Sequence, residues 1–163
     1  QIIKAGADKV FLNSAAVKQP KLILQGAEVF GSQAIVGAID AKWDEPAGIY
    51  RVYIAGGTKP TDLNALTWAQ TMVDYGAGEL LVTSMDADGT KDGYDVKLYQ
   101  ALNDVVKVPI VASGGAGKIQ DFTEVFQDGH VDAALAASVF HYNEIAIPFL
   151  KQQLYDEGIP MRR

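Results

Sequence analysis

The chain contains the run Thr83-Ser84-Met85-Asp86-Ala87-Asp88-Gly89-Thr90 directly after the apolar residues Leu80-Leu81-Val82. Two further apolar stretches, at 109–112 and 133–136, also end in small or hydroxylated residues. A short, fully apolar run that ends in a polar tip and is followed by a helical pattern is typical of a strand in a parallel sheet. The recurrence of this unit predicts a βα repeat.

Five such units can be counted along the chain. Strand-length apolar runs lie at 9–12, 34–39, 79–83, 109–112 and 133–136, and helical patterns lie at about 20–30, 61–75, 94–104, 119–128 and 144–157. Thr61 and Asp95 are plausible caps at the starts of two of these helices. The segment 43–60 is predicted to be a hairpin inserted after the second strand, either covering a ligand site or forming a plain surface excursion.

The number of units and a faint internal repeat predict an α/β fold of the (β/α)8 TIM-barrel type. The segment Gly6-Ala7-Asp8-Lys9-Val10-Phe11-Leu12-Asn13-Ser14 has the same layout as the segment 130–138, four units further on. A doubled set of four units gives the eight of a complete barrel of roughly 250 residues. We therefore expect residues 1–163 to form a single partial barrel domain that holds units four to eight and lacks the first three.

The composition is that of a globular protein with a sizeable core. Apolar residues make up 48% of the 163-residue chain, cysteine is absent and the net charge is −6. The scattered basic residues argue against binding to nucleic acid or an anionic membrane, and no apolar run has the length of a membrane span. The lack of cysteine excludes thiolate metal sites and fits a cytoplasmic location. His130 and His141 lack the spacing of a metal pair, so no metal site is expected.

Polar residues that follow the predicted strands are the candidates for chemistry, because barrel active sites gather at the carboxyl ends of strands. Asp40 follows the apolar run 36–39, so its carboxylate would project beside apolar surface and could act as a general acid or base. The alternative is a carboxylate that only caps the next loop. Asp88 is also open to two interpretations, since Asp before Gly89 and Thr90 makes a good turn as well as a catalytic group.

Two strand ends rich in Gly and Ala predict a phosphate site. Ser113-Gly114-Gly115-Ala116-Gly117 lies between a predicted strand and a helix, so bare amides could approach an anion at a helix amino end. Ala137 and Ser138 open the next helix in the same way. The loops after strands seven and eight form the common phosphate pocket of this fold, which favours phosphate binding over simple turns. Asn13 and Ser14, half a barrel away, allow a second phosphate site, so a substrate with two phosphates is expected.

These segments together resemble the cyclase subunit of imidazole glycerol phosphate synthase, a family of histidine biosynthesis. The resemblance covers nearly the whole chain, and its most discriminating motif is Ala38-Ile39-Asp40-Ala41-Lys42. The other segments that carry it are Ala7-Asp8-Lys9-Val10, Asn13-Ser14-Ala15-Ala16-Val17, Gly31-Ser32-Gln33, Gly76-Ala77-Gly78-Glu79, the run 86–93 and Ala112-Ser113-Gly114-Gly115-Ala116-Gly117.

The resemblance implies a lyase reaction without a cofactor. A bisphosphorylated phosphoribulosyl formimino aminoimidazole carboxamide ribotide and ammonia would be converted to imidazole glycerol phosphate and aminoimidazole carboxamide ribotide. By resemblance, Asp40 is the general acid, and Lys9 and Glu79 belong to a charged ring that gates ammonia delivered by a glutaminase partner. The residues that match the family's substrate contacts are Asn13, Ser14, Thr83, Ser84, Asp88 and Gly89, and those that match one phosphate site are Ser113, Gly114, Gly115, Ala137 and Ser138.

The family's first three units, with the partner catalytic Asp, have no counterpart in this chain. The isolated chain is therefore expected to have little or no cyclase activity, since two-group acid–base chemistry needs both carboxylates. An opened barrel would expose unpaired strand edges near 9–13 and 133–137, through which copies could self-associate. Two alternatives stay open: a non-catalytic phosphate-binding module, and the sister sugar-phosphate isomerase of the same pathway, against which the set at 40–42 speaks.

Overall fold

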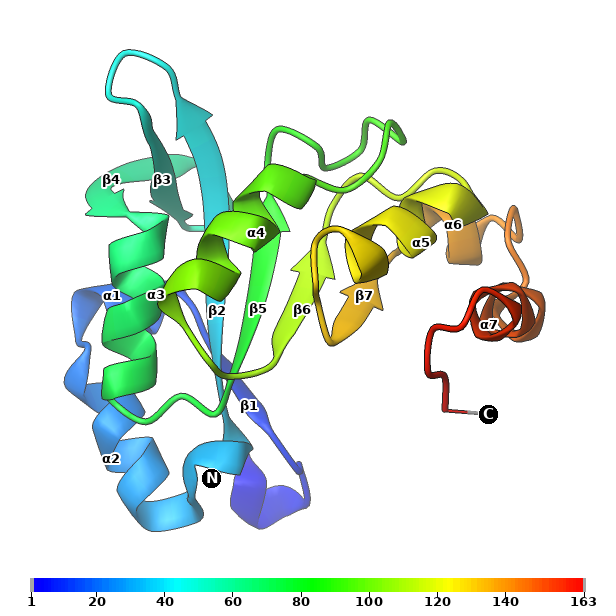
Figure 1. Ribbon diagram of the computed structural model, residues 1–163. Helices are drawn as coiled ribbons and strands as arrows, with labels where there is room; N and C mark the ends of the chain where they lie inside the picture. The colour runs from blue at the N-terminus through cyan, green and yellow to red at the C-terminus, as the bar shows by residue number, and fades with distance from the viewer. Residues whose placement is uncertain (1, 163) are drawn as a thin grey trace.

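The computed structural model describes residues 2–162, which fold around one mixed β-sheet (Figure 1). Its elements in chain order are η1 (Ile3–Ala5), β1 (Val10–Leu12), α1 (Ser14–Lys18), α2 (Lys21–Phe30), η2 (Ser32–Ala34), β2 (Ile35–Asp44), β3 (Ile49–Ile54), β4 (Lys59–Asn64), α3 (Ala65–Asp74), β5 (Glu79–Ser84), α4 (Val96–Val105), β6 (Ile110–Ser113), α5 (Ile119–Gln127), β7 (Ala133–Leu135), α6 (Ser138–His141) and α7 (Ile147–Asp156). Five strands are parallel in the order β1-β2-β5-β6-β7. This parallel sheet confirms the predicted α/β class.

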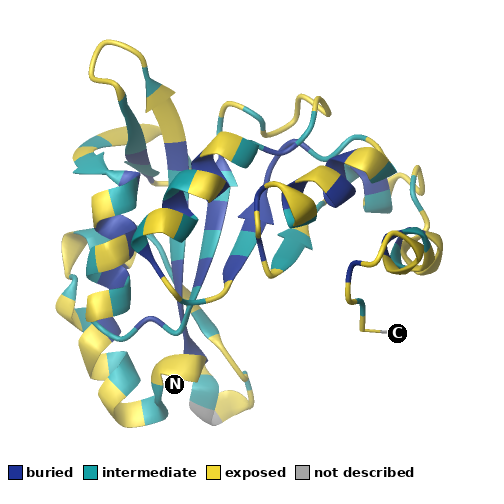
Figure 2. Ribbon diagram, viewed as in Figure 1, coloured by how far each residue is buried: buried dark blue, intermediate teal, exposed yellow. Residues whose placement is uncertain are grey.

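The two faces of the parallel sheet differ in burial (Figure 2). One face lies against helices: Leu80, Val82 and Ile110 on it are fully buried, and a Cβ at Gly37 would meet Met72 of α3. The opposite face, called here the open face, is only partly covered. At its two edges, Phe11 is 59% exposed and Leu135 is 43% exposed. The strand register places seven apolar side chains on the open face: Phe11, Val36, Ala38, Leu81, Val111, Ala133 and Leu135.

The segment 43–60 forms the predicted hairpin after the second strand. β2 continues beyond the parallel sheet and pairs antiparallel with β3, and β4 pairs with the other edge of β3. The turn between β3 and β4 reaches back to the start of α1, where the Ala55 N–H donates to Ser14 Oγ at 2.9 Å. Because β2 belongs to both parts, the hairpin extends the sheet sideways from the carboxyl-terminal half of β2 (Figure 1).

The predicted helix 61–75 begins later than expected, because its first residues belong to β4. Thr61 is not a helix cap: its hydroxyl donates to the Val52 carbonyl of the neighbouring strand at 2.8 Å. Asn64 takes that role, and its side chain accepts from Leu66 N at the start of α3. At the next helix the predicted cap is confirmed, since the Asp95 carboxylate accepts from Leu98 N at 3.1 Å.

The remaining predicted helices correspond to α2, α4, α5 and α7, with ends shifted by a few residues. The short helix α1 was not predicted, while α6 begins at Ser138 as expected from the Ala-Ser pattern. Helices α2 and α3 contact β2, and α5 contacts β7. Within residues 2–162, every helix is too short or too polar to cross a lipid bilayer.

Candidate functional site

The carboxyl ends of the parallel strands bring the predicted polar residues to one edge of the sheet. Asp40 on β2 is paired in register with Thr83 on β5, and Thr83 is paired with Ser113 on β6. Paired residues of parallel strands point to the same face, so the three side chains lie in a row at the end of the open face. Ligands of parallel α/β sheets bind at this end of the strands.

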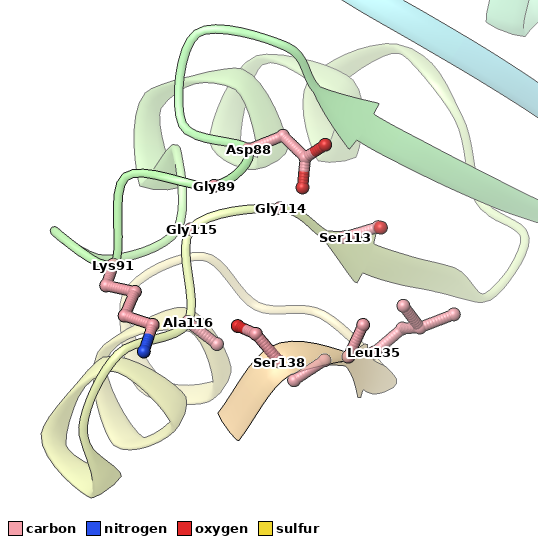
Figure 3. Close-up of a pocket in the computed structure, with 11 residues that line it drawn as sticks. Asp88, Gly89, Lys91, Ser113, Gly114, Gly115, Ala116, Leu135 and Ser138 are labelled. Carbon is pink, nitrogen blue, oxygen red and sulfur yellow. The ribbon is translucent and has the colours of Figure 1, made fainter. Parts of the chain in front are cut away.

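Two cavities open at this edge, and the first is built mainly from Gly- and Ala-rich loops (Figure 3). This glycine cavity has a volume of about 180 Å³. It contains all five residues predicted to bind phosphate, together with Asp88 and Gly89. Its lining residues are Asp88, Gly89, Lys91, Ser113, Gly114, Gly115, Ala116, Leu135, Ala136, Ala137 and Ser138.

Glycine is required where the two loops of this cavity touch. Gly115 has φ +109°, and a Cβ there would lie 2.0 Å from the carbonyl oxygen of Gly93. The Gly93 N–H donates to the Gly115 carbonyl at 2.9 Å, which fastens the loop after β5 to the loop after β6. The amides of Gly117 and Lys118 are already held by the Asp121 carboxylate, at 2.8 and 2.9 Å. These amides at the start of α5 are therefore not free for the anion contact that the sequence predicts at this helix amino end.

The second cavity lies over the Asp40 side of the edge and has a volume of about 310 Å³. This aspartate cavity adjoins the glycine cavity, because Asp88 lines both. Beside it, Asn13 Nδ2 donates to Asp40 Oδ2 at 3.1 Å, while Asn13 Oδ1 is buried without a hydrogen-bond partner among residues 2–162. The lining residues are Asp40, Gly56, Gly57, Thr83, Met85 and Asp88.

Two of the predicted substrate contacts have structural partners instead. Ser84 is fully buried, and its hydroxyl donates to Asp95 Oδ2 at 3.0 Å. It cannot reach a ligand on the open face because neighbouring residues of a strand point to opposite faces, and Thr83 takes the outward position. Ser14 lines neither cavity, and its hydroxyl accepts from the Ala55 N–H of the hairpin turn.

The ion pair predicted by resemblance lies at the other end of the strands. Lys9 Nζ is 2.5 Å from Glu79 Oε2, just before β1 and at the first residue of β5. The register places Glu79 on the same face of the sheet as Thr83. The pair and the aspartate cavity therefore lie at opposite ends of the open face.

A buried tyrosine stiffens the strands beneath the glycine cavity. The Tyr99 hydroxyl of α4 lies 3.0 Å from the carbonyls of Val82 and Ser113 and accepts from the Ser113 N–H at 3.0 Å. Burial raises the pKa of Tyr99 well above its ordinary value, because the apolar surroundings disfavour the phenolate. The end of β6 is therefore tied to β5 and to the helix layer at the residue where the glycine loop begins.

The sequence patterns missed several lining residues, among them Gly56, Gly57, Met85, Lys91 and Leu135. The only sequence feature that could have indicated Lys91 as a lining residue is its place directly after Asp88-Gly89-Thr90. The two hairpin glycines reach the aspartate cavity through the fold of the turn, which local patterns do not specify. Among residues 2–162, no group of three or more acidic or histidine side chains is arranged to hold a metal ion.

The fold and the paired cavities define an α/β protein with a candidate ligand site at the carboxyl ends of its parallel strands. The family described as "Histidine biosynthesis protein" matches residues 1–146, and the chain belongs to this family.

Curated relatives that match the chain carry the name imidazole glycerol phosphate synthase subunit HisF. The protein of Leuconostoc mesenteroides is 67% identical over 99% of this chain and 64% of its own length. The protein of Lactiplantibacillus plantarum is 60% identical over 99% of this chain and 64% of its own length. The protein of Alkaliphilus metalliredigens is 54% identical over 100% of this chain and 64% of its own length. The chain thus spans about 64% of the length of these relatives.

Proposed function

We propose that this chain is the carboxyl-terminal portion of a cyclase subunit of imidazole glycerol phosphate synthase, with its five βα units as units four to eight of a (β/α)8 barrel. The observation that carries this proposal is the row Asp40, Thr83 and Ser113 at the edge where the two cavities meet. The 67% identity to a subunit of that name supports the assignment. Residues 1–163 are one partial domain in this proposal.

The proposed substrate carries a phosphate at each end. One phosphate lies in the glycine cavity and contacts the backbone of Gly114 and Gly115, because loops with little side-chain bulk let amides approach an anion. The reacting part of the substrate lies in the aspartate cavity beside Asp40, which acts as the general acid. Asn13, which precedes Ser14 at the end of β1, contributes to the second phosphate site.

Asn13 supports this arrangement through its hydrogen bond to Asp40. Its Oδ1 is buried without a partner among residues 2–162, although its Nδ2 holds Asp40. Asn13 therefore positions the carboxylate of Asp40, which lines the aspartate cavity.

The ion pair of Lys9 and Glu79 is proposed to form part of an ammonia gate at the amino end of the barrel. Its place at the opposite end of the open face from Asp40 supports this role, because ammonia entering there would travel along the face to the reacting centre. The proposed partner at this end is a glutaminase subunit, which supplies the ammonia.

Complementation in trans tests the proposed function. The chain alone, assayed with the bisphosphorylated intermediate and ammonium salt, should show little or no turnover, because a single carboxylate cannot complete the acid–base chemistry. Addition of the preceding segment of the Leuconostoc mesenteroides relative should restore production of imidazole glycerol phosphate. In that mixture Asp40→Asn should lower kcat by about 10²–10⁴-fold.

The matched control is Asp62→Asn, which removes the same charge from a fully exposed surface position and should leave kcat unchanged. Phosphate binding without restored turnover would favour the non-catalytic module. Isomerisation of a sugar phosphate in the same mixture would favour the sister isomerase. Full turnover by the chain alone would overturn the role given to the missing units.

A further inference from the structure

The glycine cavity contains a single basic side chain among its lining residues within the described chain. That side chain belongs to Lys91, and the only acidic one belongs to Asp88. All other lining residues are Gly, Ala, Ser or Leu, which carry no formal charge. A phosphate dianion in this cavity would therefore have one ammonium group within its walls to balance its charge.

The backbone around Lys91 is fixed against the glycine loop. Lys91 has φ +62°, in the left-handed region, and its carbonyl oxygen lies 2.1 Å from the place of a Cβ at Gly117. Thr90 bonds back to the Ala87 carbonyl through both its N–H and its hydroxyl, at 3.1 and 2.8 Å. Figure 3 shows the end of the Lys91 side chain beside Ala116 of the loop after β6. The backbone of Lys91 is therefore fixed where the loop after β5 meets the loop after β6.

The Lys91 ammonium is engaged by Glu144, which lies between α6 and α7. Nζ contacts both carboxylate oxygens, at 2.6 and 2.8 Å. The Glu144 N–H donates to the Val139 carbonyl of α6, so the carboxylate is anchored to the cavity's far wall. The pair is 42% and 38% exposed, and ion pairs exposed to this degree contribute little net stability. A dianion in the cavity would compete with Glu144 for the ammonium at low cost.

We propose that Lys91 is an exchangeable cation of the phosphate site, held by Glu144 when the cavity is empty and transferred to the terminal phosphate of a phosphomonoester when it is filled. This inference rests on the phosphate role of the glycine cavity in the proposed function and adds a residue that determines its affinity. Glu144 is then a competitor of the ligand. Exchange also removes the one ion pair that joins the loop after β5 to the connection between α6 and α7.

The two partners therefore have opposite effects on binding. Lys91→Met removes a charge-assisted contact to the phosphate and should weaken binding of glycerol 3-phosphate about tenfold. Glu144→Gln removes the competitor and leaves the ammonium free, so it should tighten binding about two- to fivefold. Inorganic phosphate should show the same two shifts, because the ammonium recognises the dianion and not the glycerol.

Titration of the 163-residue chain by isothermal calorimetry measures these affinities, and amide chemical shifts of Gly114 and Gly115 locate the bound phosphate. Lys21→Met is the control for net charge, since Lys21 is exposed at the start of α2. It should bind as the unaltered chain does.

The outcomes distinguish the exchange of Lys91 from the phosphate role of the cavity. If the unaltered chain does not bind, or binds without shifts at Gly114 and Gly115, the phosphate role of the cavity and the exchange both fall. If it binds there and both variants match it, only the exchange falls. Weaker binding by both variants would show a purely structural ion pair and would also overturn the exchange.

Discussion

Gly115 is the residue on which the contact between the two loops of the glycine cavity depends most. Its φ of +109° and the 2.0 Å approach of the Gly93 oxygen leave no room for a side chain. Gly115→Ala should lower the free energy of unfolding by about 2–5 kcal/mol, since strain in φ and displacement of the neighbouring backbone add together. Urea denaturation monitored by circular dichroism measures this loss.

Gly6→Ala separates the two causes. Gly6 has nearly the same φ, +106°, but nothing lies within 4 Å of the place of its Cβ. It should therefore lose only the conformational part, about 1–2 kcal/mol. Equal losses in the two variants would contradict the role given to the close approach of Gly93.

At the scale of single elements, α4 controls the junction of β5 and β6 through Tyr99. The hydroxyl is fully buried and contacts both strands at Val82 and Ser113. Tyr99→Phe keeps the ring but removes these bonds, so it should lower the free energy of unfolding by about 1–3 kcal/mol. Tyr142→Phe, at a side chain that is 75% exposed, should change it by less than about 0.5 kcal/mol. Equal unfolding midpoints for the two variants would refute the bridging role.

The same substitution alters the response to alkaline pH. Burial raises the pKa of Tyr99, so the folded state keeps its proton when the unfolded chain releases it near pH 10. The contribution of Tyr99 to the free energy of unfolding is intact below pH 10. It is lost as the pH rises above 10, because the folded state then binds more protons than the unfolded state. Between about pH 9 and 11, Tyr99→Phe should lose less stability than the unaltered chain. The variant should still lose some stability in this pH range, because burial also raises the pKa values of Tyr50 and Tyr94.

The strands were predictable from the sequence because each is a short apolar run between polar tips, and all five parallel strands lie where those runs are. Within β5, the alternation of faces could also have excluded Ser84, since Thr83 and Ser84 cannot both point toward a ligand. β4 was mistaken for the first turn of α3 because Lys59–Asn64 has little strand propensity of its own. Its pairing with β3, which a local pattern does not contain, makes it a strand.

At the scale of the whole molecule, the unpredicted features are contacts between segments far apart in sequence. Lys91 and Glu144 are separated by 53 positions, and neither lies in a regular element whose pattern could place it. Ser14 meets Ala55 only because the turn between β3 and β4 lies next to the start of α1. The row of Asp40, Thr83 and Ser113 could be expected, since it follows from the parallel order of strands alone. Local patterns therefore predicted which strand ends line the two cavities but not which side chains bridge distant segments.

The open face and the two outer strands make self-association the expected behaviour of the chain. Among residues 2–162, β1 pairs only with β2 and β7 only with β6, so each leaves one edge without a strand partner. Phe11 lies on β1 and is 59% exposed beside the partly buried apolar residues of the open face. Unpaired edges next to apolar surface favour association with another chain. Sedimentation velocity should show a mass that rises with concentration in the micromolar range.

Phe11→Asp tests whether the open face is the surface involved. A carboxylate there would be buried in the contact without a partner, so it should weaken association by at least about tenfold in the dimer dissociation constant. Val29→Asp introduces the same charge at a residue of α2 that is 69% exposed and lies outside the strands. It should leave the dissociation constant unchanged. A chain that stays monomeric at all concentrations would refute the prediction, and equal weakening by both variants would assign association to general charge and not to the open face.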